Sequence, residues 1–138
     1  MPSSMALLAP AVCTDLVDQD DAYEDLDIRD PVLSLRDLRR YSSAYLAGSS
    51  PDDPRASPLY GDLSGLPPIL HVVGSEEMIL DQVRQAHIKI LKSGGQSQLI
   101  VEQGNFHAHY LLTGVLPEAM TSLELITNFI KKNFRQYD

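Results

Sequence analysis

Short apolar runs alternate with stretches of helical periodicity along this sequence. The first run, residues 5–9, is apolar throughout, as expected for a strand that is buried on both faces of a sheet. Two further strands are predicted over residues 69–73, directly after a pair of prolines, and over residues 97–102, directly after a glycine turn. The chain is therefore expected to build its core around a sheet.

Helices are predicted between and after these strands. The first begins near Ser34, where Asp37 three residues later gives a variant of the capping box, and it stops at Gly48. The second covers residues 78–92, and the third begins near Pro117. The positions at helical spacing are Ile79, Val83, Ala86 or His87, and Ile90 or Leu91 on the second helix, and Leu123, Ile126, Phe129 and Ile130 on the third. The alternation of strand and helix predicts an α/β fold with parallel strands and right-handed crossovers.

Composition narrows the partners and the compartment. The formal net charge of −8 argues against nucleic acid or an anionic membrane surface, because both attract basic proteins. No apolar stretch approaches the roughly 20 residues that span a bilayer, and no basic segment precedes the first apolar run as in a signal peptide. The single cysteine, Cys13, cannot form an internal disulfide, which fits a reducing compartment. We therefore expect a cytoplasmic protein with one α/β domain over residues 1–138.

Two long polar segments, residues 13–31 and 49–68, are expected to be loops. The first is strongly acidic, and we interpret it as solvated surface rather than as a metal site. The second is rich in Ser, Pro, Asp and Gly, and a loop of this length inside a compact domain is usually functional or lies over a groove. An apolar strand at the start of the chain is typical of a piece of a larger domain, so we expect the domain to be partial.

Polar side chains suited to catalysis follow two of the predicted strands. Glu76 and Glu77 follow the strand at 69–73, and His107 and His109 lie in a glycine-led loop after the strand at 97–102. In open parallel sheets, ligands bind in the crevice at the carboxyl ends of the strands. A carboxylate and an imidazole placed there can meet as two members of a Ser-His-acid triad. Taken singly, the acids also fit an ordinary helix start, and the histidines fit a solvated loop or a His-x-His metal pair.

The third member of such a triad is not found in the sequence. The chain contains no Gly-x-Ser-x-Gly nucleophile elbow and no His-Gly-Gly run for an oxyanion hole. The remaining histidines, His71 within a strand and His87 on a helix, are expected to pack or to lie at the surface. No second ligand cluster accompanies the His-x-His pair, so we expect neither a metal nor a cofactor.

Spaced motifs give the chain a resemblance to a known family. Residues 57–68 read Ser-Pro-Leu-Tyr-Gly-Asp-Leu-Ser-Gly-Leu-Pro-Pro, residues 74–81 read Gly-Ser-Glu-Glu-Met-Ile-Leu-Asp, and residues 104–107 read Gly-Asn-Phe-His. In this order they resemble the C-terminal half of the hormone-sensitive-lipase-like carboxylesterases, which are α/β-hydrolases with the triad order Ser, acid, His. The resemblance implies an α/β-hydrolase fold with parallel strands, crossover helices and an incomplete sheet.

The resemblance also assigns roles to particular residues. The family's acid lies four residues before a second Asp, so counting back from Asp81 makes Glu77 the triad acid. The motif at 104–107 makes His107 the catalytic base. The chain departs from the family pattern at Gln103, where an acidic residue is common, and at His109, where an aromatic residue is common.

Two functions follow from these observations. The first is the C-terminal portion of a serine carboxylesterase or lipase that hydrolyses small carboxylic esters, with the nucleophile and oxyanion hole supplied by an N-terminal half. This interpretation predicts that the isolated chain is inactive, because it lacks an activated nucleophile. It also predicts that the chain associates with that half or with itself, because one edge of its sheet is open. The alternative is a non-catalytic α/β module with an interaction or regulatory role.

Overall fold

A computed structural model describes residues 7–8, 14–17 and 29–134 of the chain. Its strands are β1 (Leu7–Leu8), β2 (Ile69–Gly74) and β3 (Ser97–Glu102), and its α-helices are α2 (Leu35–Leu46), α3 (Leu80–Lys92) and α4 (Pro117–Phe134). Short 3₁₀ turns occur at Pro58–Tyr60 and His109–Leu111. The predicted strand over 5–9 is described only at β1. Cys13 and most of the acidic segment 13–31 lie outside the described residues.

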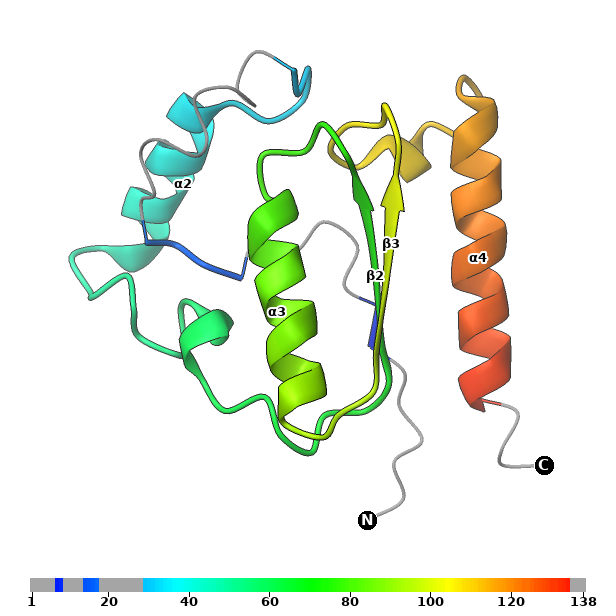
Figure 1. Cartoon of the computed structure of the whole chain (residues 1–138). Coiled ribbons are helices and arrows are strands. Elements are labelled where there is room, and N and C mark those ends of the chain that lie inside the picture. The colour runs from blue at the N-terminus through cyan, green and yellow to red at the C-terminus, as the bar shows by residue number, and fades with distance from the viewer. Residues whose placement is uncertain (1–6, 9–13, 18–28, 135–138) are drawn as a thin grey trace.

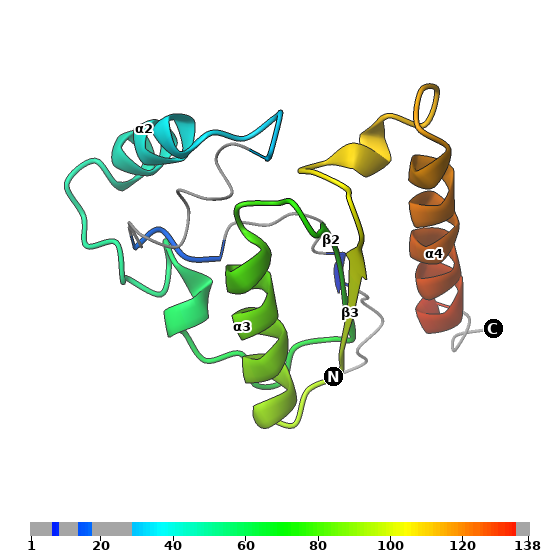
Figure 2. The same cartoon turned by 45° about the horizontal axis from the view of Figure 1, so that its top comes forward.

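The sheet is parallel and lies between two layers of helix. Its order is β1-β2-β3, and both pairs of neighbours run parallel. Helix α3 covers one face of the sheet and α4 covers the other, while α2 lies beyond α3 (Figure 1; Figure 2 shows the same layers from a second direction). This arrangement confirms the predicted α/β fold with crossover helices. Because β1 has a strand neighbour on one side only among the described residues, its other edge is open.

The central strand β2 is buried along its whole length, and its side chains contribute to two hydrophobic clusters, one on each face of the sheet. Leu70 and Val72 pack with Ile126 and Phe129 of α4 on one face of the sheet. On the other face, Val73 packs with a group from the start of α3, namely Ile79, Leu80 and Val83. The alternation of residues along β2 therefore divides its side chains between the two helical layers, as a buried parallel strand requires.

The helix boundaries follow the expected caps closely. The Ser34 side chain accepts a hydrogen bond from the Asp37 backbone N–H at 3.1 Å and so caps α2. At its other end α2 stops at Ala47 and Gly48, which both have left-handed backbone conformations. Helix α3 starts at Leu80, two residues later than predicted, because residues 75–79 form turns. Leu123, predicted on the inner face of α4, is instead 37% exposed, since the burial of α4 centres on Ser122, Ile126 and Phe129.

In the described part of the chain, none of the helices combines the length and the apolarity that a bilayer crossing needs. The predicted loop at 49–68 is also interrupted by the 3₁₀ turn at Pro58–Tyr60.

His71 of β2 is a buried imidazole with an unusual environment. It is 3% exposed, its Nε2 has no hydrogen-bond partner, and its ring meets that of His87 edge-on, with the centroids 6.3 Å apart. Burial is the main cause that lowers the pKa of His71 to about 4, and the nearby His87 lowers it further. The ring therefore stays neutral at pH values where an exposed histidine would gain a proton.

We expect His71 to make the fold sensitive to acid. Its pKa is 6.5 when exposed and about 4 in the folded chain, so the unfolded state binds more protons between these values. The contribution of neutral His71 to the free energy of unfolding is complete above pH 6.5. The free energy of unfolding then falls by about 3 kcal/mol as the pH drops to 4. Urea unfolding of the wild type and of His71→Leu across this range measures the effect. The variant should lose most of the pH dependence that the wild type shows. Equal slopes of the free energy of unfolding against pH in the two proteins would contradict this role of His71.

Candidate active site

The carboxyl ends of β2 and β3 lie side by side and bring two loops together. The strand register pairs Gly74 with Glu102, so residues 75–77 and 103–107 leave the sheet at the same level. The Ser75 N–H donates to the Glu102 carbonyl at 2.9 Å, and the Glu76 N–H donates to the Asn105 carbonyl at 3.0 Å. These bonds join the loop that carries the acids to the loop that carries the histidines.

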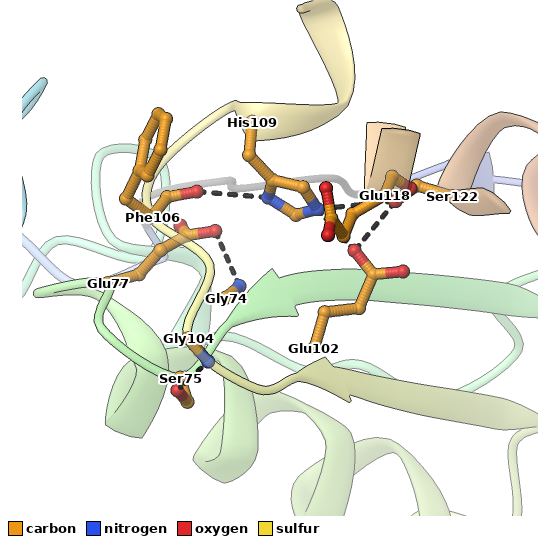
Figure 3. Close-up of polar contacts among 9 residues, drawn as sticks. All are labelled: Gly74, Ser75, Glu77, Glu102, Gly104, Phe106, His109, Glu118 and Ser122. Atoms are coloured by element: carbon orange, nitrogen blue, oxygen red, sulfur yellow. Dashed lines mark hydrogen bonds and ion pairs between the residues drawn. The ribbon is translucent and has the colours of Figure 1, made fainter. Parts of the chain in front are cut away.

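The close approach of the two loops requires glycine at position 74. A Cβ at Gly74 would lie 2.1 Å from the Asn105 carbonyl oxygen, so a larger residue would push the loops apart. Ser75 adds a side-chain link, since its Oγ accepts from the Gly104 N–H at 2.9 Å and donates to Glu76 at 2.7 Å. Figure 3 shows the Ser75–Gly104 bond below Gly74 and Glu77. The oxygen of Ser75 is thus engaged within the loops.

Glu77 is fully buried, and both of its carboxylate oxygens are engaged. Oε1 accepts the Gly74 N–H at 2.7 Å, and Oε2 lies 3.1 Å from Nδ1 of His107. Because a carboxylate accepts, the Nδ1–H of His107 is the donor in this contact. The bond to the backbone fixes the direction of the carboxylate, and the carboxylate in turn fixes the ring of His107. Glu77 and His107, each predicted from the sequence, therefore meet directly.

His107 is held in an environment that favours its protonated form. The hydrogen bond that His107 donates to Glu77 is the largest cause that raises the pKa of His107, partial burial opposes it, and the charges of Glu77 and Asp30 add to the rise. The His107 side chain remains 22% exposed. With Nδ1 committed to Glu77, Nε2 is the nitrogen that can exchange a proton with another group.

A second buried carboxylate lies close to this pair. Asp30 accepts the N–H groups of Val32 and Leu33 on Oδ1, at 3.0 and 3.1 Å, while its Oδ2 is buried with no hydrogen-bond partner. Sequence reasoning placed Asp30 only in an acidic loop and missed its role in the electrostatics of His107. The neighbouring Arg29 pairs with Glu76 at 3.5 Å. Glu76 is therefore a partly exposed ion-pair partner and not the residue that meets the imidazole.

His109 points away from His107 and joins a different group. Its Nδ1–H donates to the Phe106 carbonyl at 3.0 Å, and its Nε2 contacts Glu102 closely and Ser122 at 3.2 Å. Figure 3 shows this group between the end of β3 and α4, separate from the bond between Glu77 and Gly74. Sequence reasoning missed Glu102 and Ser122, although Glu102 ends the strand before the histidine loop. Among the described residues, no group of three or more His, Cys, Asp or Glu could hold a metal.

The geometry suits general acid–base chemistry in which a histidine is oriented by a buried acid. A ring of this kind can take a proton from a nucleophile and return it to a leaving group, while the carboxylate stabilises the imidazolium. The sequence contains no nucleophile elbow to complete the set. The described residues thus bring a carboxylate and an imidazole into the contact that the acid and the base of a Ser-His-acid triad make.

Comparisons with known proteins show which fold and which relatives the chain resembles. A family model described as alpha/beta hydrolase fold matches residues 1–111. The chain is 37% identical to an acetyl-hydrolase of Streptomyces hygroscopicus over 91% of the chain and 43% of that protein. It is 32% identical to an esterase of Acinetobacter venetianus over 94% of the chain and 42% of that protein. The chain therefore spans less than half the length of the curated relatives it matches.

Solved structures of esterases also match this chain, and again over less than half of their own length. The crystal structure of an esterase from the bacterial hormone-sensitive lipase family matches with a TM-score of 0.88 and 29% identity, covering 94% of this chain and 43% of that one. The crystal structure of an esterase named E25 matches with a TM-score of 0.81 and 31% identity, covering 91% and 39%. In both, the part that corresponds to this chain is less than half of the solved protein.

Proposed function

Since the chain belongs to the alpha/beta hydrolase fold family, we propose that it is the C-terminal portion of a serine carboxylesterase and contributes the acid and the base of the triad. The observation that carries the proposal is the contact between His107 Nδ1 and the buried Glu77 carboxylate at 3.1 Å. A carboxylate held in this way keeps the imidazole in one tautomer, with Nε2 free for proton transfer. The substrates are small carboxylic esters, in keeping with the acetyl-hydrolase and esterase names of its relatives.

The proposed reaction assigns one role to each residue. His107 Nε2 takes the proton of a serine hydroxyl as the serine oxygen bonds to the ester carbonyl carbon, and the carbonyl electrons move onto its oxygen. The intermediate collapses, the bond to the alcohol oxygen breaks, and Nε2 returns its proton to that oxygen. Water then hydrolyses the acyl-serine with the same assistance. Glu77 stays ionised throughout and stabilises the imidazolium.

The serine and the oxyanion hole come from outside this sequence in the proposal. The open edge of β1 offers parallel pairing to a preceding strand, and the relatives have more than half of their length outside the matched part. We therefore propose that the sheet is completed by a segment that carries the Gly-x-Ser-x-Gly elbow. In the absence of that segment, the open edge favours self-association.

Reconstitution tests the proposal. The chain alone should not hydrolyse an acetyl ester of p-nitrophenol above the buffer rate, because no activated nucleophile is present. Fusing the unmatched N-terminal portion of the Streptomyces hygroscopicus acetyl-hydrolase upstream of Met1 should produce hydrolysis that a serine-directed phosphonate abolishes.

Two results would contradict the proposal. Turnover by the chain alone that survives the phosphonate would exclude the serine-esterase assignment. A chimera that folds, as judged by circular dichroism and gel filtration, but shows no turnover would favour a non-catalytic module. Replacing the elbow serine of the donor portion by alanine is the matched control, since it should remove activity and leave the fold intact.

A further inference from the structure

His107 and His109, the residues on either side of Ala108, make contacts on opposite sides of the histidine loop. His107 contacts Glu77 on the acid loop, while His109 contacts Glu102 of β3 and Ser122 of α4. Ala108 has a φ of 57°, a left-handed conformation that is unfavourable for a residue with a Cβ. A residue stays in such a conformation only where the surrounding contacts hold it there. The orientation of His107 therefore depends on what holds the chain immediately after it.

The group that holds the chain there is a buried clamp formed by Glu102, His109 and Ser122. Ser122 donates to Glu102 Oε2 at 2.7 Å, and His109 Nε2 contacts the same oxygen. Figure 3 shows the His109 ring between the Phe106 carbonyl on one side and the Ser122 and Glu102 side chains on the other. The three residues come from α4, β3 and the histidine loop. The clamp thus fastens the loop to two rigid elements.

The clamp contains the residue types of a triad but lacks the arrangement of one. His109 and Ser122 are both 0% exposed, so no substrate reaches the hydroxyl. Glu102 and Ser122 also meet the same ring nitrogen, whereas a triad places acid and serine on opposite nitrogens. The other nitrogen, Nδ1, faces the Phe106 carbonyl at 3.0 Å. A structural role for the clamp therefore fits the geometry, and a second catalytic site does not.

Several polar contacts hold the clamp together. The Nδ1–H of His109 donates to the Phe106 carbonyl, and its Nε2 faces the Glu102 carboxylate and the Ser122 hydroxyl. The hydroxyl lies 2.7 Å from Glu102 Oε2 and 3.0 Å from the Glu118 carbonyl oxygen. Removing one member of such a cluster is costly, because the remaining polar groups are left without that partner. These contacts tie the chain directly after Ala108 to β3 through Glu102 and to α4 through Ser122.

We propose that His109 is a positioning residue for His107, acting through the buried clamp with Glu102 and Ser122. The proposal rests on the proposed function, in which His107 is the base. Removing the clamp lets Ala108 relax and lets His107 turn from Glu77, while the sheet and its helices remain. The expected effect is a change in the orientation of the His107 ring. It differs from a general loss of fold stability.

An NMR titration of the isolated chain tests the proposal without any need for activity. The variants are His109→Phe, which keeps a ring at that place, and Ser122→Ala, which removes only a hydroxyl. Both should lower the raised pKa of His107 toward the ordinary histidine value and weaken the downfield signal of its Nδ1–H. His87→Phe is the matched control, since His87 lies on α3 and contacts Ser97 at 2.8 Å. It should leave the His107 signals unchanged.

The reconstituted esterase provides the second measurement. His109→Phe should lower kcat by about 10²-fold with KM unchanged, the size of effect expected from a small displacement of a catalytic group. An unchanged His107 pKa and Nδ1–H signal in folded His109→Phe and Ser122→Ala would overturn the proposal. If His109→Phe does not fold, Ser122→Ala alone decides between the outcomes. A reconstituted protein without esterase activity would count against the proposed function, whereas the NMR result would still decide whether the clamp positions His107.

Discussion

Replacing His107 by Gln is expected to lower kcat of the reconstituted esterase by about 10⁶-fold, the loss that follows removal of a triad histidine. Glutamine can still hydrogen-bond to Glu77, but it cannot take the proton of a serine. The loop should keep its place, since its bonds to residues 75 and 76 come from the backbone and from Ser75. The hydrolysis of an acetyl ester under saturating substrate gives the comparison, and circular dichroism shows whether the variant folds.

The reconstituted esterase with the wild-type chain should show a pH dependence that comes from the same histidine. His107 acts as a base only when it is neutral, and its pKa is raised by Glu77 and Asp30. The value of kcat/KM should therefore fall as the pH drops through a value above the ordinary histidine pKa. His87→Gln is the control, because it removes a histidine of α3 whose ring bonds to Ser97 at the start of β3. A loss below tenfold in His107→Gln would place the base elsewhere.

The sequence predicted those parts of the fold that depend on local signals. Strand β3 and the start of α4 were found at the predicted residues, because a glycine turn and a first-turn proline mark them. The pairing of Glu77 with His107 was also predicted, because parallel strands bring the loops after them to one edge of the sheet. The choice of Glu77 over Glu76 depended on the resemblance to a family, since the two acids are equivalent by composition.

Other parts of the site depend on contacts between distant segments. Ser122 lies 20 residues from Glu102, and nothing in either local sequence indicates that the two side chains bond to each other and to His109. Asp30 lies in a segment of many acids, and only the fold shows that it is buried near His107. Leu123 fits the helical period of α4 as well as Ile126 does, yet it is exposed. Periodicity alone does not say how far a buried stripe extends around a helix.

The substitution Glu77→Gln separates orientation from proton transfer. It keeps the size of the side chain and a hydrogen-bonding group at Gly74, but it removes the charge that holds the Nδ1–H tautomer of His107. We expect kcat of the reconstituted esterase to fall by about 10⁴-fold, as after the loss of charge on a triad acid. In the isolated chain, the same change should lower the pKa of His107, because the bond to Glu77 is the largest cause of its rise.

The neighbouring acid provides a control one residue away. Glu76→Gln makes the same chemical change on a side chain that is 30% exposed and pairs with Arg29. An exposed pair of this kind contributes little, so kcat should change less than about threefold. If Glu76→Gln proved the damaging substitution and Glu77→Gln the mild one, the assignment of the acid would be shifted by one residue. The NMR titration would show the same reversal at His107, because its pKa reports which carboxylate accepts its proton.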